Sequence, residues 1–564
     1  MGRSRSPTRA DTRCGRHRCL TSGPGRRRTS GFRPTQPGRV EPMFDFPAWS
    51  RAGWATHLGG DVPADLAERL SGSTLVAELR QRSTAGPEGT ITIDEHRFTH
   101  TELALLMDSG ARHLAGVGIR PGEAVVLSVP TSPELVVAYF SLLAAGAEIV
   151  LVNPAATPDE IRFVVGDSGA RRGVAGRSSA PVCSAAGLDV IDPGRLMVEA
   201  GPAGLAGGDI QWRPRSTTVA LVAYTSGTTG RPKAVPLTHA HIQASIRGAM
   251  WAWRWSPSDV VVHALPLFHQ HGLSAVHASA LSGCSVVVRS RFDPADLSAA
   301  IDTHRATVLF AVPSIWHRML EAGEVRPWPS LRLATSGSAA LAPDVFTAIE
   351  KNLGMAPLER YGTTESGLDV SNPYEGPRRP GHVGLPLPGV DLRLDGPNAG
   401  DPERPEGEIL LRGPQVFDGY RGSPGGPDDT GGWFHTGDVG RIEDGSLRIV
   451  GRIKEMITTG GLNVYPAEVE NVLATHPAVA EVAVAGVPSD RWGEEVTAFV
   501  VVAEGHELDP AELLVAARER LSAYKCPKAV VEIEALPVNA MGKVIRSRLS
   551  RLVDQGRDLP DPRE

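Results

Sequence analysis

Short apolar runs alternate with longer amphipathic runs over most of the chain. Residues 123–129 and 148–152 are β-rich apolar runs that predict strands, and residues 133–147 between them have the length and composition of a helix. This order predicts a parallel βαβ unit with a right-handed crossover. Similar runs, each followed by a loop rich in Gly, Ser, Thr or Pro, predict strands at residues 217–224, 307–312 and 331–335. Because ligands of open α/β sheets bind at the carboxyl ends of the strands, these loops are candidates for a binding site.

The pattern changes after about residue 375, where Pro and Gly become dense through residue 427 between short β runs such as residues 409–412. A smaller unit begins near residue 452 and mixes helices with strands. Its predicted helices and strands lie at residues 466–475, 479–487, 496–502, 510–521 and 529–533. The pattern therefore predicts a large α/β unit followed by a small α+β unit.

Length and composition exclude several classes of protein. With 564 residues the chain is long enough for several domains of roughly 100–200 residues each. A hydrophobic content of 41% excludes global disorder, and a net charge of −6 gives no sign of a general nucleic-acid binder. The apolar stretch at residues 135–147 is too short to span a bilayer and predicts a buried helix.

The first 40 residues differ from the rest of the chain. They contain eleven arginines, one acidic residue and many Ser, Thr, Pro and Gly, so this segment is expected to be disordered. The same composition fits an organelle transit peptide. A third interpretation, which we favour, is a start codon assigned too early, with Met43 as the true start. The fold prediction therefore begins at residue 43.

Cysteines and lysines are both scarce. Cys183, Cys284 and Cys526 are scattered singly, which matches neither a disulfide framework nor a zinc site and fits a reducing, cytoplasmic compartment. Six lysines stand against 52 arginines, so the lysines are enriched for places that need a compact ammonium group. Their surroundings favour such a role for Lys233, Lys454 and Lys543.

A loop with the composition of a phosphate-binding site follows the strand predicted at residues 217–224. Its sequence is Thr225-Ser226-Gly227-Thr228-Thr229-Gly230-Arg231-Pro232-Lys233. Glycines let the backbone approach phosphate oxygens, hydroxyls donate hydrogen bonds, and the lysine adds charge. A P-loop would end in Gly-Lys-Ser/Thr, whereas Pro232 precedes Lys233 here, so simple γ-phosphoryl transfer is disfavoured. An ordinary polar surface loop is the alternative.

This loop resembles the signature loop of the adenylate-forming superfamily: acyl-CoA synthetases, peptide-synthetase adenylation domains and luciferases. Ala234 stands where the family usually has glycine, and further family motifs follow in order across about residues 90–550. The resemblance implies an α/β fold with a large N-terminal domain of parallel-sheet subdomains at residues 43–453. It also implies a small, mobile C-terminal α+β domain at residues 454–550 and a tail at residues 551–564.

Four further segments resemble the family's nucleotide-site motifs. The adenine and metal motif is matched by Tyr361-Gly362-Thr363-Thr364-Glu365-Ser366. An aromatic ring can pack on a purine, a threonine can bind phosphate, and Glu365 can hold Mg²⁺ through its hard oxygens. The opposite wall of the site would consist of Gly337, Ser338 and Ala339. Asp438 matches the aspartate that holds the ribose hydroxyls, and Arg452 matches the second ribose contact.

The remaining functional positions are implied by the same resemblance. Lys454 falls on the hinge between the domains, and Lys543 falls on the catalytic lysine, with Lys233 and His269 as further catalytic candidates. Gly460 and Gly461 match the loop that lines the pantetheine tunnel. For three of these residues the alternative is a structural role with no function in catalysis: a turn aspartate at residue 438, a solvated lysine at residue 543 and a core histidine at residue 269.

The substrate side resembles the malonyl-CoA synthetase branch. His269 and His271 lie in the acid-pocket segment, at residues 266–272. Segments 369–373, 379–381 and 383–389 resemble that branch, and Arg291 falls where a cation can meet a second carboxylate. Thr363 departs from the methionine often found there. Arg291 could instead be solvated and unrelated to the acid.

The resemblance implies an ATP-dependent carboxylic acid–CoA ligase that uses Mg²⁺, with coenzyme A as co-substrate. The acid is expected to be malonate or a similar short dicarboxylate. Alternatives are a medium- or long-chain fatty acid–CoA ligase and an acyl-AMP ligase that loads a carrier-protein phosphopantetheine. Two further alternatives are a phosphoryl transferase and a non-enzymatic scaffold on the same fold. A phosphoryl transferase would release ADP and orthophosphate. A scaffold would be expected to have lost Lys543, Glu365 or Asp438. No nucleic-acid partner is implied.

Overall fold

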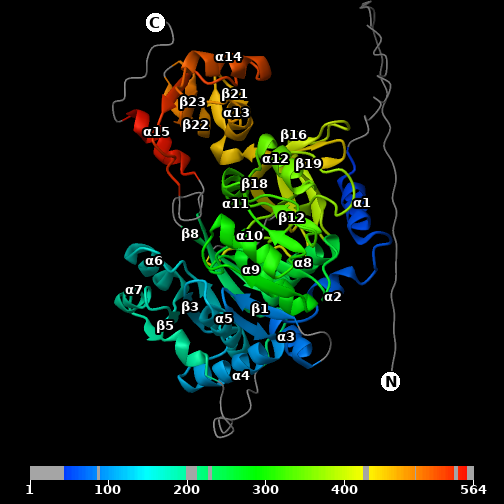
Figure 1. Ribbon diagram of the computed structural model, residues 1–564, viewed down its shortest axis with the longest axis vertical. Helices are drawn as coiled ribbons and strands as arrows, with labels where there is room; N and C mark the ends of the chain where they lie inside the picture. Colours follow the sequence, from blue (N-terminus) through cyan, green and yellow to red (C-terminus); the bar gives the residue numbers. More distant parts are fainter. Residues whose placement is uncertain are drawn as a thin grey trace, which may run out of the picture. The chain divides into compact units, whose positions relative to one another are not determined.

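The computed structural model describes seven stretches of the chain. They are residues 44–84, 89–198, 213–226, 232–422, 431–489, 491–538 and 544–554. The N-terminal extension at residues 1–42 lies outside them. Figure 1 shows the described elements with their labels.

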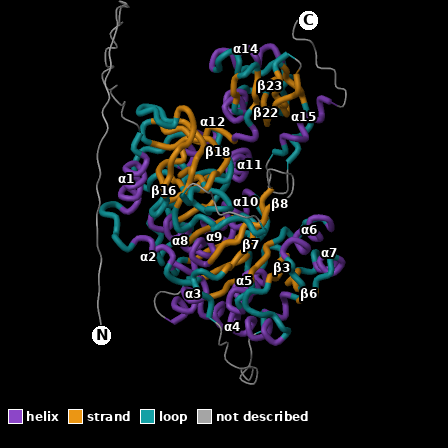
Figure 2. Tube along the Cα trace, turned by 180° about the vertical axis from the view of Figure 1, so that it is seen from behind, coloured by secondary structure: helices purple, strands orange, loops and turns teal. Residues whose placement is uncertain are grey.

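A six-stranded sheet has the strand order β6-β5-β3-β4-β7-β8. Its strands are β3 (Ala124–Ser128), β4 (Glu148–Leu151), β5 (Arg172–Ala175), β6 (Asp189–Ile191), β7 (Val219–Ser226) and β8 (Pro232–Thr238). The first five are parallel, and β8 pairs antiparallel with β7. The sheet is accompanied by α5 (Pro133–Ala145), α6 (Pro158–Ser168), α7 (Ala180–Ala185) and the 3₁₀ turn η1 (Pro193–Leu196) (Figure 2).

Helix α5 shows how the sequence sets the first βαβ unit. The Ser132 hydroxyl accepts a hydrogen bond from the Leu135 backbone N–H, and Pro133 occupies the first turn, where no intrahelical N–H bond is lost. Gly146 ends the helix with φ of 80°, a left-handed conformation that glycine adopts without strain. Every residue from 135 to 145 is buried, so α5 is the internal helix that its apolar composition predicts.

A second, larger sheet runs in the order β16-β17-β18-β19-β15-β14-β13-β12-β11-β9-β10-β1-β2. Its central strands pair in parallel: β1 (Thr90–Ile93), β9 (Val260–His263), β10 (Ser285–Val288), β11 (Val308–Phe310), β12 (Leu333–Ser336) and β13 (Leu358–Tyr361). The others pair antiparallel: β2 (His96–Thr99), β14 (Val370–Ser371), β15 (His382–Pro386), β16 (Asp391–Asn398), β17 (Glu406–Arg412), β18 (Phe434–Glu443) and β19 (Ser446–Arg452).

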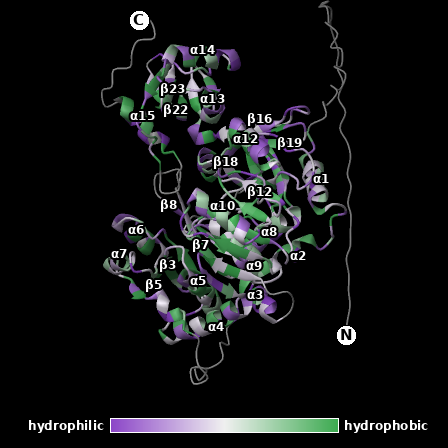
Figure 3. Cartoon of the chain, in the orientation of Figure 1, coloured by the Kyte–Doolittle hydropathy of each residue, from purple (hydrophilic) through white to green (hydrophobic). Residues whose placement is uncertain are grey.

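Nine helices accompany this sheet in the described residues. They are α1 (Phe46–Leu58), α2 (Leu66–Ser71), α3 (Leu75–Thr84), α4 (His100–Gly116), α8 (His239–Ala252), α9 (Gln270–Ser282), α10 (Pro294–Thr303), α11 (Pro313–Glu321) and α12 (Pro343–Leu353). Hydrophobic residues follow the inner strands, whereas hydrophilic residues mark the outer helix surfaces (Figure 3).

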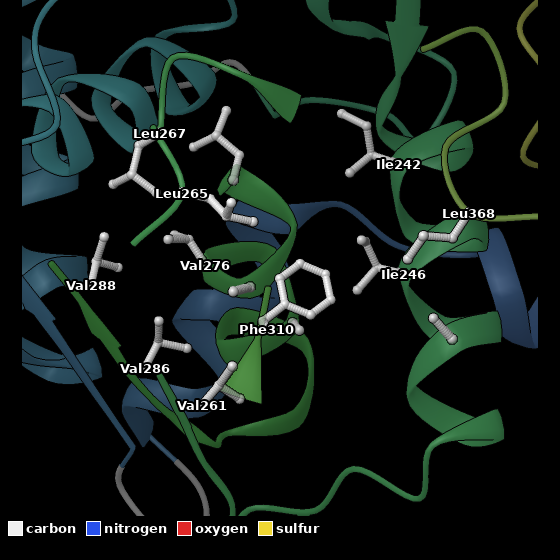
Figure 4. Close-up of a cluster of buried hydrophobic side chains, with 14 of the residues drawn as sticks. Ile242, Ile246, Val261, Leu265, Leu267, Val276, Val286, Val288, Phe310 and Leu368 are labelled. Carbon is white, nitrogen blue, oxygen red and sulfur yellow. The ribbon is translucent and has the colours of Figure 1, made fainter. Parts of the chain in front are cut away.

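Phe310, at the end of β11, lies at the centre of a buried apolar cluster in this part of the core. Ile242 and Ile246 from α8 and Leu368 approach it from one side, and Val276 from α9 lies on another (Figure 4). Its side chain is 1% exposed. Burying an aromatic side chain of this size contributes about 1.5–3 kcal/mol, so β11 is held firmly against α8 and α9.

The C-terminal unit has a hydrophobic core of its own. It contains η3 (Ile453–Glu455), β20 (Ile457–Thr459), β21 (Leu462–Val464), α13 (Pro466–Leu473), β22 (Val479–Ser489), β23 (Gly493–Val502), α14 (Pro510–Arg520), β24 (Ala529–Glu532) and α15 (Arg546–Asp554). Val484, Val496 and Val500 from the sheet pack with Leu473 and Leu513 from the two helices that cover it. The predicted fold class, a large α/β domain with a smaller α+β domain, is confirmed.

No helix in the described ranges is both long and apolar enough to cross a membrane. Cys183, Cys284 and Cys526 are buried free thiols.

Candidate active site

The two ends of the phosphate loop are joined by strand pairing. Thr225 at the end of β7 pairs with Lys233 near the start of β8, so the loop closes a β-hairpin. Gly227, Thr228, Thr229 and Gly230 lie outside the described residues, as does the side chain of Ser226. The Lys233 Nζ lies 4.6 Å from the centre of the Tyr420 ring, a cation–π contact that holds the ammonium group beside this hairpin.

Glu365 faces the same hairpin. Its Oε1 accepts a hydrogen bond from the Tyr420 hydroxyl at 2.9 Å and a longer one from Thr225 Oγ1 at 3.4 Å. Burial, followed by the Glu365 charge, raises the pKa of Tyr420, which therefore stays a hydrogen-bond donor. The structure thus brings Thr225, Lys233 and Glu365 together, with Tyr420 as a residue that sequence reasoning missed.

The described residues contain no cluster of three or more His, Cys, Asp or Glu side chains that could hold a metal alone. A single carboxylate beside a phosphate loop fits Mg²⁺, which keeps several waters and is usually held by one or two carboxylates and the phosphates of its substrate. Glu365 is the carboxylate that would bind it beside the phosphate hairpin.

Asp438 is buried between Tyr361 and Arg452. It is 2% exposed, and its carboxylate accepts a hydrogen bond from the Tyr361 hydroxyl at 2.7 Å and from Arg452 Nε at 2.6 Å. The pair is set by register, because Asp438 on β18 lies opposite Arg452 on β19. Burial, followed by the Asp438 charge, raises the pKa of Tyr361 well above its ordinary value, so its hydroxyl remains protonated. These three predicted nucleotide-site residues lie together.

Hydrogen bonds within the segment between Tyr361 and β14 hold it in a turn. The Asp369 backbone N–H donates to the Tyr361 carbonyl at 3.0 Å, and the Ser366 hydroxyl donates to the Asp369 carboxylate. At Gly362 a Cβ atom would lie 1.8 Å from the Gly367 carbonyl, so only glycine fits this turn. Thr364 is half-buried in the same turn.

The loop after β12 carries the predicted opposite wall. Gly337 is buried, whereas Ser338 and Ala339 are exposed. Ser338 has φ of 73°, which is uncommon for a residue other than glycine, and its hydroxyl lies 2.8 Å from His271 Nδ1. The other ring nitrogen of His271 is hydrogen-bonded to Arg360 NH2.

Both predicted acid-pocket histidines are held neutral. His269 stands at the N-cap of α9 and is half-buried, and burial lowers its pKa to about 4. Burial and the adjacent Arg360 lower the pKa of His271 well below its ordinary value. Arg291, by contrast, is exposed just after β10, and within the described ranges no hydrogen bond or ion pair is formed by its side chain.

Four predicted positions concern the C-terminal unit. Lys454 lies in η3, and partial desolvation, followed by the charges of Arg452 and Lys233, lowers its pKa. Gly460 and Gly461 form the β20–β21 turn with φ of 58° and 79°. Lys543 lies outside the described residues.

Comparison with known proteins establishes the family. The chain matches the AMP-binding enzyme family over residues 79–421 and the AMP-binding enzyme C-terminal domain over residues 468–543. It therefore belongs to the AMP-binding, adenylate-forming enzymes, and it is an AMP-forming acyl-CoA synthetase that uses ATP, Mg²⁺ and CoA. The predicted resemblance, enzyme class and cofactors are confirmed.

The relatives differ in their named substrates. An oxalate–CoA ligase of Arabidopsis thaliana is 35% identical over 80% of this chain and 92% of its own length. A malonate–CoA ligase of Xenopus laevis is 30% identical over 84% and 91%. The ATP-bound structure of MatB from Rhodopseudomonas palustris superposes with a TM-score of 0.78 at 33% identity, covering 84% of this chain and 98% of that one. Relatives named for ferulate and for long-chain fatty acids also match.

Proposed function

We propose that this acyl-CoA synthetase activates a short dicarboxylic acid such as malonate or methylmalonate. The observation that carries this proposal is a buried arginine, Arg360, at the strand end that also bears the nucleotide residue Tyr361. A second carboxylate buried near ATP phosphates would be very costly without a cation. The names of the oxalate and malonate relatives support the same class of acid.

The apolar space next to this site supports a short acid. Trp253, Trp255 and Phe310 pack with ring centres 5.9–6.4 Å apart. The free volume that remains among them and the neighbouring side chains of α8 and α9 is about 10 Å³. This is roughly the room for one water molecule, so the chain of a fatty acid could enter here only if these side chains moved.

In the first half-reaction, an oxygen of the near carboxylate attacks the α-phosphorus of ATP, and the bond to the pyrophosphate oxygen breaks. We assign Lys233 and the phosphate hairpin to the ATP phosphates, and Asp438 and Arg452 to the ribose. Lys543 stabilises the charge that develops at the α-phosphate. Glu365 would hold Mg²⁺, which would neutralise phosphate charge.

In the second half-reaction, the CoA sulfur attacks the acyl carbonyl, the thiol proton is lost, and AMP leaves. We assign His269 to the gate of the acid pocket, Lys454 to the hinge that changes the orientation of the C-terminal domain, and the Gly460–Gly461 turn to the pantetheine arm. Transfer to a carrier-protein phosphopantetheine instead of CoA is the second candidate function.

Pyrophosphate release, measured over about twenty acids of both classes, tests the proposal. We expect the highest kcat/KM for a dicarboxylate of three or four carbons, with a CoA thioester formed in the absence of any carrier protein. A preference for fatty acids would contradict the dicarboxylate assignment, and thioester formation only on a carrier protein would contradict CoA as the acceptor.

A further inference from the structure

Tyr420 lies in a short segment that is joined to two parts of the active site through its backbone. The Phe417 N–H donates a hydrogen bond to the Glu365 carbonyl at 2.9 Å. Four residues later, the Arg421 N–H donates to the carbonyl of Ala234 on β8 at 3.0 Å. Tyr420 is therefore held between the proposed metal ligand and the strand that bears the phosphate-binding lysine.

Packing and an ion pair also hold this segment in place. Phe417 is 1% exposed, and its ring centre lies 4.9 Å from that of Tyr420 in an edge-to-face arrangement. Next along the chain, Arg421 forms an ion pair with Glu148 at the start of β4. These contacts restrict the freedom of the Tyr420 ring to turn away from the site.

The ring and the hydroxyl of Tyr420 contact different partners. Lys233 Nζ lies over the face of the ring, 4.6 Å from its centre, whereas the hydroxyl bonds Glu365 Oε1 at 2.9 Å. The tyrosine is the donor of this bond, because its raised pKa keeps it protonated and an ionised carboxylate can only accept. One side chain thus contacts both the lysine assigned to the phosphates and the carboxylate assigned to their metal.

The hydrogen bonds that the Glu365 carboxylate accepts from described residues go to one of its two oxygens. Thr225 Oγ1 lies 3.4 Å from Oε1, which also accepts the Tyr420 bond, whereas Oε2 accepts none from that part of the chain. Mg²⁺ demands near-ideal octahedral geometry, so a ligand that is already oriented suits it. Oε2 is therefore the oxygen that remains for a metal.

We propose that Tyr420 is a positioning residue for the metal, because its hydroxyl fixes Glu365 Oε1 and so keeps Oε2 available to Mg²⁺. This inference rests on the proposed role of Glu365 as the magnesium ligand. Losing the hydrogen-bond partner of a metal-binding side chain typically lowers metal affinity about 10–100-fold. In this role Tyr420 acts through Glu365 and needs no contact with the metal.

Tyr420→Phe tests the proposal with little disturbance of the site, because the ring keeps its contacts with Lys233 and Phe417. Titration calorimetry of the full chain, with no acid present, measures the affinity for ATP in EDTA and for ATP with excess Mn²⁺. The first value reports on the phosphate contacts alone, and the second adds the metal. The Mg²⁺ concentration needed for half-maximal pyrophosphate release is then measured with the preferred acid of the panel.

In Tyr420→Phe we expect about 10-fold weaker binding of manganese–ATP and a similar rise in the Mg²⁺ requirement, with metal-free ATP binding unchanged. Tyr224→Phe is the matched control, because the Tyr224 hydroxyl also donates to a carboxylate, Asp167 Oδ2 at 2.7 Å. Tyr224 precedes Thr225 on β7, so its side chain points to the opposite face of the sheet. The control should retain the wild-type value in all three measurements.

A double variant shows whether Tyr420 acts through Glu365. Glu365→Ala leaves no side-chain oxygen to be held, so adding Tyr420→Phe to it should weaken manganese–ATP binding no further. Additive losses overturn the proposal, as do wild-type values in Tyr420→Phe or an equal loss of ATP affinity with and without the metal; Glu365 then keeps its role. Wild-type manganese–ATP binding in Glu365→Ala contradicts the proposed role of Glu365 itself, and the inference falls with it.

Discussion

The conversion of Asp369 to asparagine should remove a defined part of the pH dependence of stability. Asp369 is fully buried, and its carboxylate accepts hydrogen bonds from Ser366 Oγ and from Gln415 Nε2, the latter at 3.1 Å. Burial outweighs these bonds and raises the pKa of Asp369 from 3.8 to about 7. Because its backbone N–H also holds the Tyr361 carbonyl, Asp369 connects the protonation state of the core to the nucleotide motif.

The sign of the effect follows from the raised pKa. The folded state binds the proton more tightly than the unfolded state, so the contribution of this group is fully favourable below pH 3.8 and is lost as the pH rises to about 7. Each pH unit in this window costs about 1.4 kcal/mol, which gives about 4 kcal/mol over the whole window. The asparagine side chain of the variant cannot ionise, and its amide can still bond both Ser366 and Gln415.

Chemical denaturation of the wild type and of Asp369→Asn at a series of pH values measures this difference. Tryptophan fluorescence reports on the same region, because the Trp253 indole N–H donates to Ser371 Oγ at 2.8 Å. Between about pH 5 and about pH 8, we expect the free energy of unfolding of the wild type to fall by about 3 kcal/mol relative to the variant. Burial also raises the pKa of Glu359, to about 8. The free energy of unfolding of the wild type should therefore fall relative to that of Glu359→Gln as well, over a pH range that ends about one unit higher. Parallel curves for the wild type and Asp369→Asn would refute the reasoning.

Three further predictions concern the chemistry. Lys543→Ala should lower the rate of adenylation roughly 10²–10³-fold, equal to about 2.7–4 kcal/mol, and largely spare thioester formation from supplied acyl-AMP; unchanged pyrophosphate exchange would remove Lys543 from this role. Lys454→Pro should let adenylate form and accumulate on the enzyme, because a stiffened hinge impedes the change between half-reactions; equal slowing of both would show that Lys454 is not the hinge. Glu365→Gln should raise the Mg²⁺ concentration needed for half-maximal activity, because an amide is a poorer ligand for a hard cation, and an identical Mg²⁺ titration would argue against this site.

Local sequence signals predicted the elements of the fold well. The run at residues 148–152 became β4 (Glu148–Leu151), and the run at residues 133–147 became α5 with its serine and glycine caps. The order of strands in the sheets could not be predicted from these local signals. One neighbour of β1 is β2, which follows it in sequence, but the other is β10, almost 200 residues later, and no periodicity within either strand specifies that pairing. Long-range strand order depends on how whole layers pack, which local patterns do not encode.

The site residues also divide into those that the sequence predicted and those that it did not. Thr225, Lys233, Tyr361, Glu365, Asp438 and Arg452 stand in motifs with a recognisable composition, and the structure brings them into two small groups. Tyr420 carries no such signal, because a single tyrosine in a loop reveals its role only when its hydroxyl is found on Glu365 at 2.9 Å. The scarcity of lysine was only a partial guide to the site, because some of the few lysines have a structural role. Lys525, for example, forms an ion pair with Glu468 in the C-terminal unit, at 2.6 Å.

The pair Arg360–Tyr361 shows what the reaction requires of the fold. Adenylation joins a carboxylate to the α-phosphate of ATP, so the pocket for the acid and the pocket for the nucleotide must meet at one point. Two consecutive residues at the end of a strand satisfy this requirement, because their side chains lie on opposite faces a few ångströms apart. Tyr361 is fixed by Asp438 and Arg360 by His271 and Phe310, each through partners from other strands and helices. Under the proposed function, we therefore expect a substitution at residue 360 to change the choice of acid, while the contacts of Tyr361 on the other face of β13 remain in place.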